Sequence, residues 1–310
     1  MTESLTLPII DLSSSDRIST AKSIRQAWIE FGFFYLVNHG VEEEMFQRMF
    51  EESSRLFSLP LEDKTKMSRK NQRGYTPLYA ENLDPSTTSK ELIVVNCLRN
   101  RRLERGFLHW SFGRNYQGPE SMAFKRSAGK QLIYLSALAL NLDEDFFDKV
   151  GAMDVPMPFL GLLHYPEIYS ASAHKDFGMI TLLATDGVPG LQVCRDKSQQ
   201  PGLWEDVPNI SGAFIVNIED IMERWTNCLF RSTLHRVMPT GQERYSAAFF
   251  LDPNNDCVMK CLESCCNESC PPRFPPIRSI DYLKQRFRGF IHESEGFSPL
   301  MLADDNGKSM

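Results

Sequence analysis

AHKDFGMITLLATDGVPGLQV, residues 173–193, is the stretch of this sequence that decides the fold. It places a histidine and an aspartate, His174 and Asp176, two residues apart, and an apolar run interrupted by Asp-Gly and Pro-Gly follows them. Short apolar runs bounded by such turn residues predict β-strands. On an extended segment, side chains two residues apart point to the same side, so this pair can converge on one point. Whether the pair forms a metal site depends on residues further downstream.

The sequence around this stretch predicts a core rich in β-structure. From residue 157 onward, short apolar runs recur at close spacing, separated by Asp-Gly, Pro-Gly, Pro-Asn and Thr-Gly pairs. These runs are FLGLLHY, MITLLA, GLQVC, GAFIVNI, STLHRVM and RYSAAFFL. Several short strands with frequent turn signals are typical of an all-β sandwich or barrel.

The N-terminal part of the chain has a helical pattern. Apolar residues recur at spacings of three and four over residues 16–31 and 42–58, and a third helix is expected to begin near residue 127. Between the first two helices, FFYLVNHG (33–40) has the aromatic and branched residues of a buried strand. The apolar face of the first helix is expected to contain Ile18, Ala21, Ile24, Trp28 and Phe31.

Composition is that of an ordinary globular enzyme. The 310 residues are 42% hydrophobic and 24% charged, with a formal net charge of −6 and a pI near 5.6. This acidic balance gives no general attraction to nucleic acid or to an anionic membrane. No apolar run approaches the roughly 20 residues of a membrane helix, and the N-terminus lacks the pattern of a secretory signal. We therefore expect a cytoplasmic protein, and we take it to be a monomer.

We expect one domain, because no internal repeat or low-complexity linker divides the chain. Within it we distinguish a mostly helical N-terminal region (1–150), a β core (151–255) and a C-terminal loop and helix (256–310). The arginine-rich, irregular segment 84–128 contains Phe107, Trp110 and Phe112, a combination that nucleic-acid-binding segments also show. The acidic whole and the lack of a recognised module favour a solvated loop.

Five of the eight cysteines crowd into one segment: Cys257, Cys261, Cys265, Cys266 and Cys270. Paired cysteines of metal-binding knuckles are usually separated by two residues. Here the gaps are three residues, and two of the cysteines are adjacent. Reduced thiols in a loop are therefore favoured over a structural zinc site.

His235, in STLHRVM, is the residue that could complete a metal site with the pair. If its strand lies beside the segment of His174, three ligands face one point. Two neutral imidazoles and one carboxylate, with open positions opposite, suit Fe(II) and O2 chemistry, whereas a structural zinc site is closed by a fourth protein ligand. A His-x-Asp pair also arises by chance, and a histidine within a strand is often a core residue, so these three residues alone leave both interpretations open.

Arg244 and Ser246 favour the metal site. They lie on the same side of the strand RYSAAFFL, shortly after His235. An arginine that points into a barrel needs an anion, because an unpaired buried guanidinium is costly. The guanidinium fork and the hydroxyl together can bind a carboxylate. A dicarboxylic keto acid would satisfy both sites, with its keto-acid end on the metal and its far carboxylate on Arg244.

With these residues in view, the sequence resembles the plant-type Fe(II)- and 2-oxoglutarate-dependent dioxygenases that share the isopenicillin N synthase fold. The resemblance covers most of the chain, and its LLHYP strand is similar to that of one subgroup. The motifs that carry it, in chain order, are LPIIDLS, AWIEFGFFYLVNHGV, AHKDFGMITLLATDGVPGLQV, WEDVPNISGAFIVNIED, FRSTLHRV and RYSAAFFLDP. The resemblance implies a distorted double-stranded β-helix, or jelly-roll, with flanking helices.

The resemblance also implies roles for individual residues. The family's iron ligands fall on His174, Asp176 and His235. Its 2-oxoglutarate contacts fall on Arg244, Ser246 and Tyr165, the last of which could also be an ordinary core aromatic. The implied reaction takes O2 and 2-oxoglutarate, gives succinate and CO2, and hydroxylates or desaturates a small organic molecule of plant specialised or hormone metabolism. Ascorbate is a candidate reductant.

Three departures from the family pattern bear on substrate recognition and stability. Residues 90–126 do not read like the segment that normally walls the substrate pocket. Glu219 stands where relatives commonly have glycine, and a glutamate there would be strained if the backbone needed a positive φ. Gly161 replaces a usual basic residue. A further family position, His39 in VNHG, is expected to be a structural, hydrogen-bonded imidazole.

Three alternative functions stay open from the sequence. An oxidase that does not use 2-oxoglutarate could have the same ligands, since Arg244 and Ser246 can hold another carboxylate. A catalytically impaired iron-binding relative could keep the site but lack a substrate wall in residues 90–126. A metal hydrolase could use these ligands with zinc and would show no dependence on O2.

Overall fold

The structure is a computed structural model that describes residues 6–67, 74–76, 96–99, 128–154, 156, 158–168, 170–196 and 202–288. Most of the irregular segment, including Phe107, Trp110 and Phe112, lies outside the described residues. The expectation that residues 90–126 depart from the usual pocket wall is therefore not tested by the structure.

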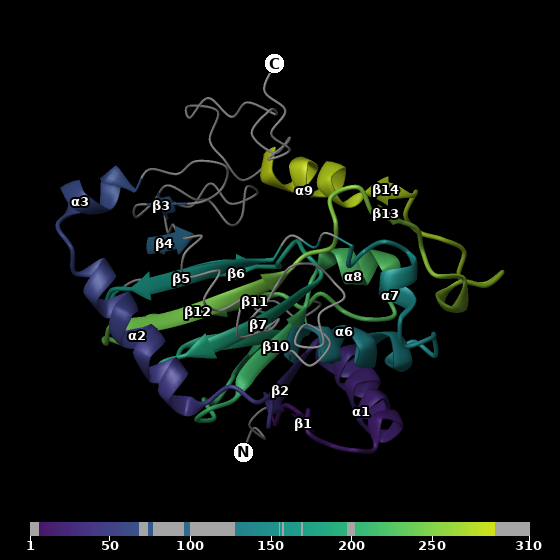
Figure 1. Ribbon diagram of the computed structural model, residues 1–310, viewed down its shortest axis with the longest axis horizontal. Coiled ribbons are helices and arrows are strands. Elements are labelled where there is room, and N and C mark those ends of the chain that lie inside the picture. The colour runs from purple at the N-terminus through teal and green to yellow at the C-terminus, as the bar shows by residue number, and fades with distance from the viewer. Residues whose placement is uncertain are drawn as a thin grey trace.

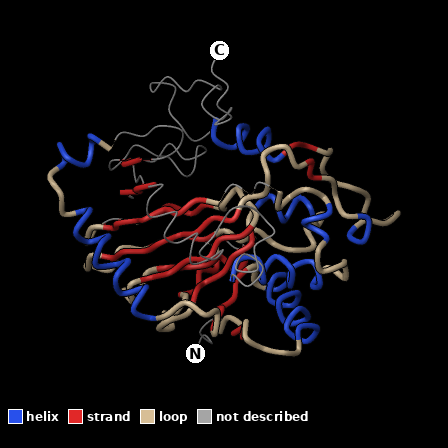
Figure 2. Tube along the Cα trace, viewed as in Figure 1, coloured by secondary structure: helices blue, strands red, loops and turns tan. Residues whose placement is uncertain are grey.

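Two β-sheets form the centre of the molecule, with helices at its periphery (Figures 1 and 2). The larger sheet has eight strands in the order β1-β2-β10-β7-β12-β5-β4-β3. Its strands are β1 (Ile9–Asp11), β2 (Phe33–Val37), β10 (Phe214–Ile218), β7 (Ile180–Thr185), β12 (Arg244–Leu251), β5 (Phe159–Tyr165), β4 (Asn96–Arg99) and β3 (Gly74–Thr76). The smaller sheet has the order β6-β11-β8-β9, with β6 (Ala171–His174), β11 (His235–Val237), β8 (Leu191–Asp196) and β9 (Leu203–Asp206).

The two sheets pack face to face through one apolar cluster. It joins Phe33, Tyr165 and Ile215 of the larger sheet to Leu191 and Val193 of the smaller one. All five side chains are buried. Removal of this apolar surface from water is the main force that holds the layers together. The jelly-roll expected from the sequence is thus confirmed, and each of the six apolar runs contains a strand.

The N-terminal helices cover the sheets much as the sequence predicts. Helix α1 (Arg17–Glu30) packs on β2 and on α6 (Ala128–Ala139), and α2 (Glu43–Phe57) contacts β12 and β5 and runs across one end of the strands (Figure 1). The expected apolar face of α1 is wrong at one position, because Ile18 is 57% exposed. The buried face instead contains Thr20, Ala21, Ile24, Ala27 and Trp28.

The ends of α1 explain why the helix occupies these residues. The side chain of Asp16 accepts a hydrogen bond from the backbone N–H of Ser19 at 2.9 Å and so satisfies one of the free donors at the first turn. At the other end, Gly32 has a φ of +72°, which favours glycine. A Cβ at Gly32 would also lie 2.3 Å from the carbonyl oxygen of Arg231, so this turn requires glycine for space as well.

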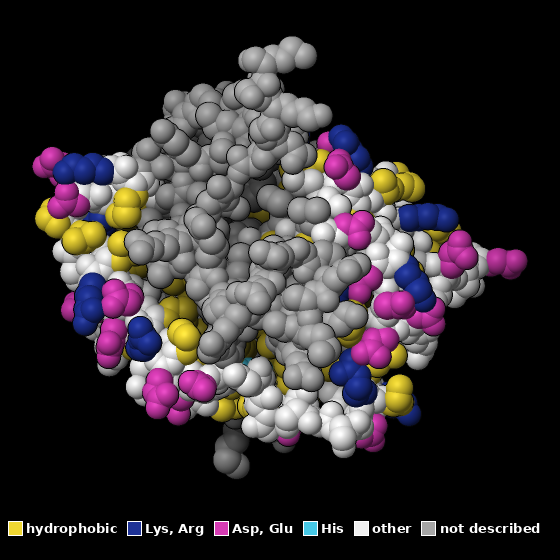
Figure 3. Space-filling model, in the orientation of Figure 1, with side chains coloured by type: hydrophobic (Ala, Val, Ile, Leu, Met, Phe, Trp, Pro, Cys, Tyr) yellow, Lys and Arg dark blue, Asp and Glu magenta, His cyan; other side chains and the backbone are white. Residues whose placement is uncertain are grey.

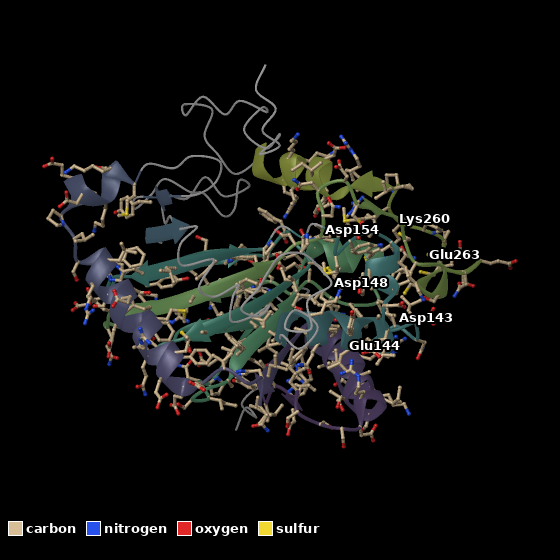
Figure 4. All side chains as sticks on the ribbon, viewed as in Figure 1. Asp143, Glu144, Asp148, Asp154, Lys260 and Glu263 are labelled. Carbon is tan, nitrogen blue, oxygen red and sulfur yellow. The ribbon has the colours of Figure 1, made fainter. Side chains whose placement is uncertain are left out.

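Charged side chains join the helices on one side of the molecule. Figure 4 labels Asp143, Glu144, Asp148 and Asp154 there, with Lys260 and Glu263 of the C-terminal loop beside them.

Asp148 forms an ion pair with the buried Lys130 of α6 and accepts a hydrogen bond from Tyr134. Glu144 pairs with Arg17 of α1. These contacts hold α1, α6 and the short α7 (Phe146–Lys149) together, which is a structural role.

The C-terminal part packs on the core as a loop with little regular structure. Its elements are β13 (Val258–Met259), a 3-10 turn (Glu263–Cys265), β14 (Ile277–Arg278) and α9 (Ser279–Arg288). Among the described residues, two further short helices are α3 (Leu61–Lys66) and α8 (Asp220–Trp225). The cysteines of this loop are free thiols, as the sequence favoured.

The surface carries charges of both signs. On the face shown in Figure 3, Lys and Arg side chains alternate with Asp and Glu side chains around the rim. Within the described ranges, no helix has both the length and the apolar character that a membrane crossing requires.

Candidate metal centre and anion site

Two histidines meet across the smaller sheet. His174 is the last residue of β6 and His235 is the first residue of β11, and the two are paired directly across the strands. Their ring centroids lie 4.3 Å apart. The apolar pattern of the sequence did not mark β6, which is a separate short strand before β7, and Asp176 lies in the loop that joins the two strands.

His174, Asp176 and His235 converge as the sequence predicted. The Nε2 atom of His174 lies 3.6 Å from Oδ1 of Asp176, and that of His235 lies 3.7 Å from Oδ2. One ligand atom from each residue falls within 4.8 Å of the others, so the three could hold a metal ion. Among the described residues, no second group of three His, Cys, Asp or Glu side chains meets this test, and the cysteine loop therefore gives no metal site by this measure.

Both imidazoles are oriented for metal binding through Nε2. The Nδ1 atoms lie 2.7 Å from the carbonyl oxygen of Ser172 and 3.1 Å from that of Thr233. A carbonyl oxygen only accepts, so each Nδ1–H donates and each Nε2 keeps its lone pair for a metal. Burial, together with the neighbouring His235 ring, lowers the pKa of His174 to about 4. His174 is therefore neutral near pH 7, which is the form that binds a metal.

Asp176 is held in place by side chains of the larger sheet. Asn217 of β10 donates from Nδ2 to Oδ2 of Asp176 at 2.9 Å, and the hydroxyl of Thr181 on β7 lies 3.4 Å from the same oxygen. Sequence reasoning missed both residues. The available signal was a polar side chain inside each of two otherwise apolar runs, MITLLA and FIVNI.

Glu219 is a second residue whose role the sequence did not predict. Its φ is −113° and its ψ 175°, which is extended backbone, so the expected strain of a non-glycine residue is absent. The side chain is 1% exposed. It accepts a hydrogen bond from the Gly178 N–H at 2.6 Å and lies 2.8 Å from the Thr181 hydroxyl.

Arg244 and Ser246 form a buried polar site on β12. They are 2% and 1% exposed. Arg244 uses Nε to donate to the carbonyl oxygen of Val188 at 3.2 Å. Its Nη1 and the Ser246 hydroxyl have no hydrogen-bond partner within the part of the chain that the structure describes. Because buried polar atoms in folded proteins are nearly always paired, these two fit an anion such as a carboxylate.

Tyr165 lies beside this anion site. It is the cross-strand neighbour of Arg244, and its ring centroid is 5.0 Å from the guanidinium carbon. The ring also belongs to the apolar cluster between the sheets, so both interpretations of this residue agree with its position. Another ring of that cluster, Phe33, packs edge-on against His235, with the ring centroids 5.5 Å apart.

Two further residues of the sequence motifs have structural roles. Lys175, between the two candidate ligands, lies 2.9 Å from Glu223 and 3.7 Å from Asp220, so its charge is neutralised away from the metal centre. His39 is buried, with Nε2 2.8 Å from the Gly212 carbonyl oxygen and Nδ1 accepting from the Val41 N–H at 3.1 Å. The expectation of a buried, hydrogen-bonded imidazole is confirmed.

Comparison with known proteins agrees with this geometry. A family model described as the N-terminal part of the non-haem dioxygenase in morphine synthesis matches residues 7–111, and the model of the 2OG-Fe(II) oxygenase superfamily matches residues 158–253. The second match spans both histidines, Asp176, Arg244 and Ser246.

Relatives from plants and a fungus are similar over nearly the whole chain. Kihadalactone A synthase LFS of Citrus sinensis is 36% identical and azadirone synthase LFS of Melia azedarach 34%; each alignment covers 91% of this chain and 91% or 92% of the relative. The crystal structure of a full-length Neurospora crassa protein in complex with alpha-KG superposes with a TM-score of 0.71 at 27% identity, covering 93% of this chain and 97% of that one.

Proposed function

Because the chain belongs to the 2OG-Fe(II) oxygenase superfamily and is a 2-oxoglutarate-dependent dioxygenase, we propose that His174, Asp176 and His235 hold its iron. We further propose that Arg244 and Ser246 bind the far carboxylate of 2-oxoglutarate. The family membership favours this oxygenase chemistry over the metal hydrolase that the sequence alone left open.

The observation that carries this proposal is the buried polar pair on β12 that has no partner among the described residues. Arg244 Nη1 and Ser246 Oγ are buried, and the described chain offers them no partner, so a carboxylate from outside is the group that satisfies them. A guanidinium in a dry site binds a carboxylate strongly because both charges are poorly solvated there. Tyr165, whose ring lies against Arg244, is positioned to contact the same molecule.

The protein residues divide the work of the reaction. When bound, the iron supplies O2 activation, coupled to the decarboxylation of 2-oxoglutarate to succinate and CO2. His174 and His235 offer Nε2 atoms that the carbonyl partners of Nδ1 orient in advance. Asn217 fixes the Asp176 carboxylate. The apolar cluster around Phe33, Leu191 and Val193 excludes water from the space between the sheets.

The substrate we propose is a small organic molecule of plant specialised or hormone metabolism, which is hydroxylated or desaturated. Both plant relatives are named as synthases of individual compounds, kihadalactone A and azadirone, which supports this class. A cytoplasmic monomer that binds neither nucleic acid nor membrane, and the division of the chain at residues 150 and 255, stay predictions. Size-exclusion chromatography with light scattering checks whether the protein is a monomer.

The test combines binding with turnover. Under anaerobic conditions, Fe(II) and then 2-oxoglutarate are added while the weak visible charge-transfer band of the ternary complex is recorded. Candidate metabolites are then added with O2, and succinate release and O2 uptake are measured together. We expect the band to form and the two rates to match. O2 uptake without succinate would favour the oxidase that does not use 2-oxoglutarate, and binding without any uptake would favour the impaired relative.

A further inference from the structure

A buried carboxyl group, that of Glu219, contacts the Thr181 hydroxyl, which also lies beside the proposed ligand Asp176. Glu219 follows β10 and opens α8, yet its side chain turns into the protein and makes no capping bond to that helix. Among the described residues, no Lys, Arg or His side chain forms an ion pair with it; its contacts are Gly178 N–H and the Thr181 hydroxyl. Burial of a carboxyl group costs free energy unless another contribution offsets it, so its position calls for an explanation.

We propose that Glu219 is a positioning residue for the metal-facing carboxylate of Asp176, acting through the Thr181 hydroxyl and the Gly178 backbone amide. The inference rests on the proposed function, since it takes Asp176 to be an iron ligand.

Hydrogen-bond accounting gives the direction of this connection. The Gly178 N–H can only donate, so Oε2 of Glu219 accepts from it at 2.6 Å. The single hydrogen of the Thr181 hydroxyl has two candidate acceptors, Oε1 of Glu219 at 2.8 Å and Oδ2 of Asp176 at 3.4 Å. If Glu219 donates from Oε1 to Thr181, the threonine hydrogen turns to Asp176. Oδ2 of Asp176 then has two donors, Thr181 and Asn217, and Oδ1 faces His174.

The surroundings of Glu219 favour the donating form. Burial raises its pKa well above the usual range, and the charges of Asp176 and Asp252 raise it further. A neutral carboxyl group has one donor and one acceptor, which matches the hydroxyl of Thr181 and the amide of Gly178 in number and kind.

The loop that follows Asp176 brings the backbone amide of Gly178 close to the carboxyl group of Glu219. A Cβ added at Gly178 would lie 1.7 Å from Oδ1 of Asp252 and 2.9 Å from Oε2 of Glu219. Only glycine fits there, so the backbone amide can reach the buried carboxyl group. The same loop carries Asp176 two residues earlier, and the backbone N–H of Asp220, next to Glu219, donates to the Asp176 carbonyl oxygen at 3.1 Å. Ligand and supporting residue are thus joined through backbone and side chain.

Partners that orient a metal ligand typically affect metal affinity by about 10–100-fold when they are removed. Three variants separate the positioning role from simple packing. Glu219→Gln keeps one acceptor and one donor, Glu219→Met keeps similar volume without either, and Thr181→Val removes only the hydroxyl. Thr20→Val is the matched control, because Thr20 is also buried and its hydroxyl bonds a backbone carbonyl far from the metal centre.

The measurement is the Fe(II) affinity of the full chain, determined anaerobically by competition with a coloured chelator, without 2-oxoglutarate or turnover. Glu219→Gln and Thr20→Val should bind within about 2-fold of the wild type, and Glu219→Met and Thr181→Val about 10–100-fold more weakly. The double variant Glu219→Met/Thr181→Val should be no weaker than the weaker single variant, since both act along one path.

Each result has a defined meaning. Unchanged Fe(II) affinity in Thr181→Val and Glu219→Met overturns the inference, even if urea unfolding shows that the variants are less stable. Additive losses in the double variant also overturn it. If Glu219→Met does not fold, Thr181→Val and Glu219→Gln decide the matter. A wild type that binds no Fe(II) would instead remove the proposed ligand set, so failure of the function and failure of this inference are distinguishable.

Discussion

At the scale of single residues, the most informative feature is a cation that the chain places in its interior with an incomplete set of partners. Arg244 is almost fully buried, and one of its nitrogens has no acceptor among the described residues. A buried polar group that is left unpaired costs free energy, and a ligand that pairs with it removes that cost. Arg244 therefore indicates that the ligand is an anion. The neighbouring Ser246 hydroxyl indicates that the ligand also forms a hydrogen bond there.

Replacement of Arg244 by alanine should weaken 2-oxoglutarate binding strongly and leave iron binding nearly unchanged. Loss of one partner of a buried, hydrogen-bonded charge pair costs about 2–5 kcal/mol, which is roughly a 30-fold or larger rise in Kd. Isothermal titration of the iron-loaded protein with 2-oxoglutarate measures this Kd. Arg195→Ala serves as the control, because the Arg195 side chain is more than half exposed and, among the described residues, pairs with Glu205 on the smaller sheet. An equal Kd for Arg244→Ala and the wild type would contradict the assignment.

The residues of the site divide into those that sequence could predict and those that it could not. The two histidines, Asp176, Arg244 and Ser246 were found because their spacing on extended segments and their cost of burial are visible in one dimension. Thr181 and Glu219 were not found, since an isolated threonine in a strand and a glutamate before a helix have ordinary local explanations. Their importance arises from contacts between segments about forty residues apart, and no local pattern shows these.

At the scale of elements, the first turns of α1 and α2 differ in whether a side chain caps the helix. Asp16 caps α1, whereas Glu42 occupies the same position in α2 and makes no side-chain capping bond. Asp16→Ala should therefore lower the free energy of unfolding by about 1 kcal/mol, and Glu42→Ala by much less. Urea unfolding followed by circular dichroism gives both values. Similar losses in the two variants would show that the capping bond of Asp16 is not the cause.

The turn after β2 should make stability depend on pH. His39 needs its neutral form, because Nδ1 accepts from Val41 N–H while Nε2 contacts the Gly212 carbonyl oxygen. Burial lowers its pKa below the usual 6.5. The unfolded chain therefore binds the proton first, and the free energy of unfolding falls as pH decreases from about 6.5 toward the folded-state pKa.

The variant His39→Asn isolates this contribution. Urea midpoints of the wild type and the variant are compared at pH 7.5 and pH 5.5. We expect the wild type to lose more stability than the variant on acidification, although His164 and His174, whose pKa values burial also lowers, contribute to both proteins. An identical pH dependence in the two proteins would rule out His39 as a source.

One element of the site was invisible to sequence reasoning for a physical reason. Strand β6 reads ASAH, and only Ala171 of its residues is buried. The search for strands relied on apolar runs, which mark segments that face a core. Of the four β6 residues, only Ala171 joins the apolar cluster between the sheets, so hydrophobicity does not mark the strand that carries a ligand. The longer strands β5, β7, β10 and β12 face the apolar clusters and were recognised.

At the scale of the whole molecule, metal binding should stabilise the fold by mass action. A ligand that binds only the folded chain adds about 2.7 kcal/mol at a free concentration 100 times its Kd. Anaerobic thermal unfolding with and without Fe(II) should therefore show a higher midpoint with metal, reversed by a chelator. Asp176→Ala should fold but show no such shift. A shift of full size in that variant would place the bound metal elsewhere.

The three proposed ligands are not all attached to the same layer. His174 and His235 belong to the smaller sheet, while hydrogen bonds from Asn217 and Thr181 tie Asp176 to the larger one. An ion bound by all three ligands would therefore cross-link the two sheets. Without the ion, apolar contacts join the sheets at this point. Without it, the sheets can separate locally more often, and local opening exposes chain to proteases. Iron supply would then govern how long each molecule survives in the cell, as well as whether it is active.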